Sequence, residues 1–107
     1  MNSLGIDFGT GNSVLAEWQC SKAVLFSKIG ANGSVCSDVV VEEAARILPD
    51  PAFILSDQPK NRKIETAIKR RLLEALDNGD TEAVDYLKSC AAARLKYVFD
   101  AFSAQSE

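Results

Sequence analysis

The sequence predicts an α/β fold in which an antiparallel β-meander is followed by two or more helices. Residues 1–42 consist of short β-rich runs separated by turns that contain Gly and Asn, which is typical of a meander. From Asn61 onward, apolar residues recur every three or four positions, which is the period of an amphipathic helix. We therefore divide the chain into a β-meander, residues 1–42, and a mainly helical part, residues 43–107, packed on one face of the sheet.

Four strands are predicted in the first part, and each is bounded by a turn signal. They cover Leu4–Phe8, Ser13–Trp18, Ala23–Ile29 and Val35–Glu42. The turn before the last strand holds the pair Asn32-Gly33, which favours positive φ angles.

The middle of the chain is divided by prolines. Pro49, Pro51 and Pro59 exclude a continuous helix here, because proline lacks an amide hydrogen and clashes with the preceding helical turn. We predict one or two helical turns over Glu42–Leu48 and a short extended segment over Ala52–Leu55.

Two helices are predicted in the last part. The first begins near Asn61, carries Ile64, Ile68, Leu72 and Leu76 at spacings of four, and ends at Asn78-Gly79, a common C-terminal stop. The second is capped by Asp80 or Thr81 and runs to about Ser103, with one apolar stripe.

Composition narrows the class of protein. The chain has 107 residues, of which 47% are hydrophobic and 25% charged, and a net charge of −3. This balance is typical of one globular domain and argues against a nucleic-acid partner; we interpret the basic run Lys60–Arg71 as a solvated helix face. No apolar stretch has the length of a bilayer span and no signal-peptide pattern is present, so no membrane partner is predicted.

The cysteines indicate a reducing compartment. Cys20, Cys36 and Cys90 are odd in number and have no metal-ligand spacing, so we expect reduced thiols and a cytoplasmic protein. The chain contains no His, which removes Ser-His and Cys-His nucleophile mechanisms and most zinc sites.

The turn between the first two strands is the main candidate for chemistry. Asp7 ends the first strand, and Gly9-Thr10-Gly11-Asn12 follows at once. Amide groups of such a loop can bind an anion, and Asp7 can hold Mg²⁺ through its waters. No Walker lysine is present, so the turn is not a P-loop. From the pattern alone, a phosphate loop and a plain hairpin turn both remain open.

Residues 4–13, Leu-Gly-Ile-Asp-Phe-Gly-Thr-Gly-Asn-Ser, resemble the first phosphate-binding motif of the actin-like ATPases, and the Asn-Ser ending is similar to that of the heat-shock-70 chaperone family. Residues 31–40 resemble a later strand of that family, with Cys36 in place of its Pro. Residues 67–72, Ala-Ile-Lys-Arg-Arg-Leu, are similar to its catalytic Lys-Arg-Leu segment. The last predicted helix resembles the one that precedes the family's next core strand.

This resemblance implies a partial lobe of an actin-like (ribonuclease-H-like) ATPase domain, with ATP and Mg as cofactors of the intact protein. Asp7 would face the magnesium waters, and Lys69 would orient the attacking water. Together these two would be the catalytic residues. The phosphates would be held by the loop residues Gly9, Thr10, Gly11, Asn12 and Ser13.

Departures from the family pattern limit this expectation. Gly11 stands where the family has a second Thr, and neither the second phosphate loop nor the adenosine loop is present. We therefore expect weak or no ATP binding and no hydrolysis by this chain alone, and its partner would be the remainder of the ATPase domain. The alternative is a stand-alone interaction module that pairs with a second copy of itself. A sugar-kinase or bacterial-actin fragment would share the loop but not the Asn12-Ser13 ending.

Overall fold

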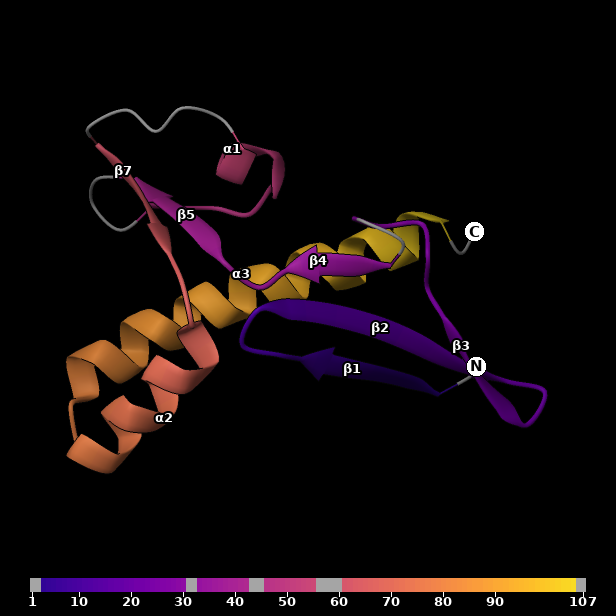
Figure 1. Ribbon diagram of the computed structural model, residues 1–107, viewed down its shortest axis with the longest axis horizontal. Coiled ribbons are helices and arrows are strands. Elements are labelled where there is room, and N and C mark those ends of the chain that lie inside the picture. The colour runs from indigo at the N-terminus through magenta and orange to yellow at the C-terminus, as the bar shows by residue number, and fades with distance from the viewer. Residues whose placement is uncertain (1–2, 31–32, 43–45, 56–60, 106–107) are drawn as a thin grey trace.

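The computed structural model describes residues 3–30, 33–42, 46–55 and 61–105, and shows two antiparallel sheets joined by a long C-terminal helix (Figure 1). The predicted combination of antiparallel strands followed by C-terminal helices is confirmed. None of the described helices combines the length and the apolar character that a membrane span needs.

The first sheet is built around one long strand, β2 (Asn12–Gln19). β1 (Leu4–Phe8) pairs with β2 along one edge, so that Phe8 lies opposite Ser13. Two short strands share the other edge: β3 (Lys22–Leu25) pairs with the end of β2, and β4 (Ser34–Cys36) pairs with its start. β3 ends before the predicted Ile29, because the chain leaves the sheet after Phe26 and buries Ile29 in the core.

The prediction of a single strand over Val35–Glu42 is wrong. The segment forms β4 and then β5 (Val39–Glu42), which belong to different sheets. The break is at Ser37, whose amide donates to the carbonyl of Gly11, and at Asp38, whose carbonyl accepts from Arg94. Both partners are distant in the sequence, and they hold the chain where it crosses between the sheets.

The second sheet has the order β6-β5-β7 and corrects three further predictions. Arg46–Leu48 is strand β6 and not helix, because it pairs with β5; residues 43–45 lie outside the described residues. Arg62–Glu65 is strand β7, on the other edge of β5, where a helix was predicted. Ala52–Leu55 is a short helix, α1, instead of an extended segment, and the Asp50 carboxylate accepts the Ala52 amide at 2.9 Å.

The end of α2 and the start of α3 lie at the predicted signals. α2 (Ile68–Asn78) stops at Gly79, whose φ of 67° is left-handed. α3 (Thr81–Gln105) follows, and the Asp80 carboxylate caps it by accepting the Ala83 amide at 3.2 Å. α2 starts later than predicted, because Ala67 takes a left-handed conformation with φ 50°.

The core consists of two apolar clusters, and α3 contributes to both. Its first half, with Leu87 and Cys90, packs with β5 and α2, while its second half, with Val98, packs against the first sheet. α3 therefore connects the two sheets along its length (Figure 1).

Candidate functional site

The β1–β2 turn is closed by its own backbone. The amide of Gly9 donates to the carbonyl of Asn12 at 2.9 Å. A Cβ atom at Gly9 would lie 2.6 Å from that carbonyl oxygen, whereas a Cβ at Gly11 would have no heavy atom within 4 Å. The turn therefore requires glycine at residue 9, and it leaves residue 11 free to vary.

The tip of this turn faces solvent. Thr10 and Gly11 are exposed, and among the described residues their amide groups donate to no other backbone group outside helices and strands. Exposed backbone amides without a protein acceptor are the groups with which a loop binds a phosphate. These two amides, together with the Thr10 hydroxyl, are what the turn can offer to an anion.

Asp7 lies at the end of β1 with its carboxylate in solvent. Its neighbours in the strand, Ile6 and Phe8, pack into the core, so the alternation of a strand directs Asp7 to the opposite face. Among the described residues, Asp7 takes part in no salt bridge, and no group of three potential metal ligands is present. A metal ion here would have one protein carboxylate and otherwise water or phosphate ligands, a coordination that suits Mg²⁺.

Asn12 and Ser13 differ in accessibility. Asn12 is exposed beside Cys36, which pairs with it, whereas Ser13 is fully buried. The hydroxyl of Ser13 lies 2.7 Å from the hydroxyl of Ser37. In this conformation the Ser13 side chain fixes the base of the β1–β2 turn to Ser37, where the chain crosses from the first sheet to the second.

Lys69 is exposed in the first turn of α2, and it forms no salt bridge within the described part of the chain. Figure 1 shows the β1–β2 turn directed toward the start of this helix, and Phe8 packs against the same apolar cluster as Ile68. The structure thus brings the predicted loop and the predicted lysine to the same end of the molecule. Neither a capping side chain nor an acid occupies the first turn of α2.

A buried carboxylate with two more exposed basic partners lies beside this end, and the sequence analysis did not identify it. Glu65 on β7 is buried and accepts from Arg71 at 3.1 Å, with Lys63 at 3.4 Å. Burial, followed by the charge of Glu65, raises the pKa of Tyr86 to about 12, and burial also raises the pKa of the Cys90 thiol. Lys63 and Glu65 are two residues apart, as on one face of a strand, and this spacing could have indicated β7. Residues 61–65 also fitted the helical period, so the strand was not predicted.

Arg94 is a second buried charge that the sequence analysis missed. The side chain is fully buried on α3, and donates to the carbonyls of Pro49 at 2.9 Å and Asp38 at 2.6 Å. Its Nε has no hydrogen-bond partner among the described groups. Burial lowers the pKa of Arg94. The available signal was its position on the apolar stripe, four residues from both Cys90 and Val98.

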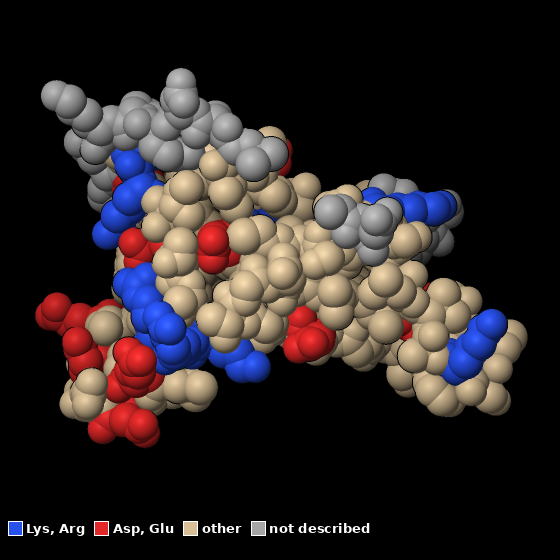
Figure 2. All heavy atoms as spheres, viewed as in Figure 1, with Lys and Arg blue, Asp and Glu red and all other residues tan. Residues whose placement is uncertain are grey.

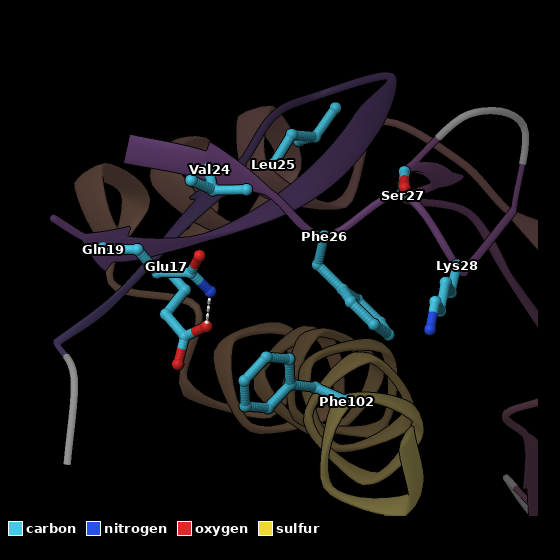
Figure 3. A pocket seen from close by; sticks show the side chains of 8 residues that line it. All are labelled: Glu17, Gln19, Val24, Leu25, Phe26, Ser27, Lys28 and Phe102. Atoms are coloured by element: carbon cyan, nitrogen blue, oxygen red, sulfur yellow. Dashed lines mark hydrogen bonds between the residues drawn. The ribbon is translucent and has the colours of Figure 1, made fainter. Parts of the chain in front are cut away.

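A hollow in the described part of the molecule is remote from the predicted site. It has a volume of about 310 Å³ and lies between the first sheet and the end of α3 (Figure 3). Phe26 and Phe102 meet edge to face across it, with ring centroids 5.2 Å apart, and Gln19 donates to Glu17 at its rim. None of the predicted site residues lines this hollow.

Comparison with known proteins does not add to this description: no protein-family model, curated protein or solved structure matches the chain.

Proposed function

We propose that this chain is the N-terminal part of a heat-shock-70-like ATPase domain and that it contributes the first phosphate loop. The observation that carries the proposal is the β1–β2 hairpin, in which an exposed carboxylate, Asp7, precedes a turn whose outer amides donate to no other described backbone group outside helices and strands. Phosphoryl transfer depends mainly on positioning and on neutralisation of charge. A magnesium ion on Asp7 and amides at Thr10 and Gly11 would serve both needs.

The roles of the residues follow from their positions. Gly9 closes the turn and keeps the loop compact, while Thr10 and Gly11 would contact the β and γ phosphates. Asp7 would bind the waters of Mg²⁺, which usually keeps several of them. Lys69, exposed at the start of α2, would orient the attacking water once the other half of the cleft is in place.

The remainder of the ATPase domain is the proposed partner. β1 is an edge strand in the described sheet, since β2 occupies one side and the other side has no described neighbour. An unpaired edge can accept a further strand through its main-chain groups. We propose that the next core strand of the complete domain pairs here and brings the second phosphate loop opposite the first.

The proposal is tested by NMR titration of this chain with Mg-ATP. We expect chemical-shift changes confined to residues 7–13 and Lys69, with a dissociation constant on the order of millimolar, because half of the cleft is missing. Asp7→Asn should remove the dependence on magnesium, whereas Asp100→Asn, an exposed acid on α3, should leave it unchanged. Gly11→Thr, for which the turn has room, should tighten binding.

Two results would contradict the proposal. One is the absence of shifts in residues 7–13 at about 10 mM Mg-ATP, a concentration that would detect a very weak site. The other is an unchanged magnesium dependence in the Asp7→Asn variant. Micromolar binding in calorimetry would instead refute the expectation that the loop is half of a binding site.

A further inference from the structure

α2 presents two leucines to solvent. Leu73 is 57% exposed and Leu76 is 55% exposed, the highest values among the exposed large apolar side chains described. Residues three apart lie on the same side of a helix. The other side of α2 buries Ile68 and Ala75 in the first apolar cluster. We refer to the surface formed by Leu73 and Leu76 as the leucine face.

Charges are separated along this helix. Lys69 and Arg70 lie in its first turn, whereas Asp77 lies in its last turn; Asp80 lies beyond Gly79 and caps α3. Figure 2 shows the same separation, with acidic side chains over the α2–α3 turn and basic side chains over β7 and the start of α2. The helix dipole favours the reverse order, acids first and bases last. The order of charges along α2 therefore does not stabilise the helix itself.

We propose that the leucine face joins two copies of this chain in an antiparallel, twofold-symmetric dimer. The midpoint between Leu73 and Leu76 falls between Glu74 and Ala75. A twofold axis through this point places Leu73 against the partner's Leu76, and Leu76 against the partner's Leu73. Such an interface uses the same patch on both copies and closes on itself.

The separated charges match under the same axis. Arg70 lies on the same flank as the partner's Asp77, offset by about 3 Å along the helix axis at 1.5 Å per residue. A parallel pair would bring the basic turns of both copies together. Charge complementarity therefore selects the antiparallel pair.

Within α2, Arg70 has only a long contact with Glu74, at 3.9 Å, and both side chains are exposed. An exposed pair of this kind contributes little to stability, so Arg70 is available to the partner's Asp77. The dimer does not depend on phosphate binding, but it would partly cover Lys69. The variants that test it therefore avoid Lys69 and the β1–β2 turn.

Sedimentation velocity of the full chain between about 10 µM and about 1 mM tests the dimer, because an interface well below the roughly 1,600 Å² of a standard complex associates weakly. We expect a concentration-dependent shift from monomer to dimer. Leu73→Glu with Leu76→Glu should give a monomer throughout. The matched control is Leu25→Glu, which charges an exposed leucine on β3 and should dimerise as the wild type does.

Charge reversal distinguishes this interface from general hydrophobic association. Arg70→Glu should weaken dimerisation about fivefold, the size of an ion-pair effect near a surface. Adding Asp77→Arg to that variant should restore it, because both partners of the pair are then reversed. Circular dichroism of each variant checks that the fold is retained, and the double leucine variant should retain the Mg-ATP shifts of residues 7–13.

The proposal is overturned by a wild-type monomer at about 1 mM, the upper limit for a weak complex of this size. It is also overturned if the double leucine variant still dimerises, if oligomers grow beyond two copies, or if the Asp77→Arg addition does not restore what Arg70→Glu removes.

Discussion

Gly9 and Gly11 stand two residues apart in the same turn, but only Gly9 is required by the packing. A Cβ at Gly9 would approach the Asn12 carbonyl oxygen to 2.6 Å, whereas a Cβ at Gly11 would meet open space. We expect Gly9→Ala to lower the free energy of unfolding by about 1–3 kcal/mol, as overpacking does. Gly11→Ala should change it by about 0.5 kcal/mol or less. Urea unfolding of both variants measures the difference.

Equal stabilities of the two variants would mean that the turn is not closed by the contact between Gly9 and Asn12. If the difference is found, the two glycines have separate uses. Gly9 holds the turn, and Gly11 leaves space at its tip, where the proposed function places a phosphate. That assignment also explains why a threonine would fit at Gly11 without distorting the hairpin.

Single residues also mark where sequence reasoning was insufficient at the candidate site. The acid, the glycine turn and the exposed lysine were identifiable from local pattern and resemblance. The burial of Ser13 was not, because it depends on Ser37, which is 24 positions away and joins it through a 2.7 Å contact of hydroxyls. A local pattern carries no information about such a partner.

Among the elements, those with local determinants were predicted well. β1 has its predicted bounds, and Gly79 and Asp80 end α2 and begin α3 as expected. The segment Val35–Glu42 was not divided correctly, since its break depends on Gly11 and Arg94, which come from other elements. The composition of Val35–Glu42 is β-rich throughout, so it did not indicate that the chain changes sheet within this segment.

The start of α2 was misplaced for a different reason. Ile64 and Ile68 are four residues apart, but Ile64 lies on β7 opposite Val40, whereas Ile68 is buried at the start of α2. This spacing fits a helical period, so the pattern extended the helix back to Asn61. The helix begins after Ala67, which has a left-handed conformation. Alanine rarely adopts this conformation, so the residue type gave no indication of the boundary.

Arg94 is the residue through which α3 holds the segments that flank the second sheet. Its guanidinium donates to Asp38, before β5, and to Pro49, after β6. Arg94→Ala should lower the free energy of unfolding by about 3 kcal/mol, because two backbone carbonyls lose their donor and a cavity forms at a fully buried side chain. Arg94→Met, which fills the space without a charge, should cost less. Thermal and urea unfolding measure both.

The matched control is Lys96→Ala on the same helix, where an exposed pair with Asp100 is lost. Its effect should be about 0.5 kcal/mol or less. If Arg94→Ala proved no more harmful than this control, the connection between α3 and the second sheet would rest on apolar packing alone.

At the scale of the whole molecule, α3 couples two clusters of different chemistry. The cluster with the first sheet is apolar and aromatic, with Phe26 against Phe102. The cluster with the second sheet contains Cys90 and packs against Tyr86, and burial raises the pKa of both groups. Alkaline pH should therefore act on the molecule through the second cluster, at the end where the loop and Lys69 also lie.

The pH dependence of stability follows from the pKa of Tyr86, which burial raises from 10 to about 12 in the folded chain. Below pH 10 the hydroxyl is protonated in both states and its contribution is fully present. Between pH 10 and 12 the unfolded chain ionises first, so the stability falls, by up to about 2 kcal/mol. Cys90 adds a loss of the same sign that begins near pH 9, because burial raises its pKa too.

Urea unfolding from pH 8 to pH 11.5, with the tyrosinate absorbance followed in the folded state, checks this expectation. Tyr86→Phe should be at least as stable as the wild type at pH 8, because the buried hydroxyl makes no hydrogen bond of good geometry with the described groups, so its burial is poorly compensated. The same variant should lose less stability above pH 10. Cys90→Ala should reduce the part that begins near pH 9, to which Cys36 also contributes because burial raises the pKa of its thiol. If Tyr86→Phe and the wild type lose stability in parallel above pH 10, the hydroxyl is not the group responsible, and the alkaline sensitivity belongs to another part of the molecule.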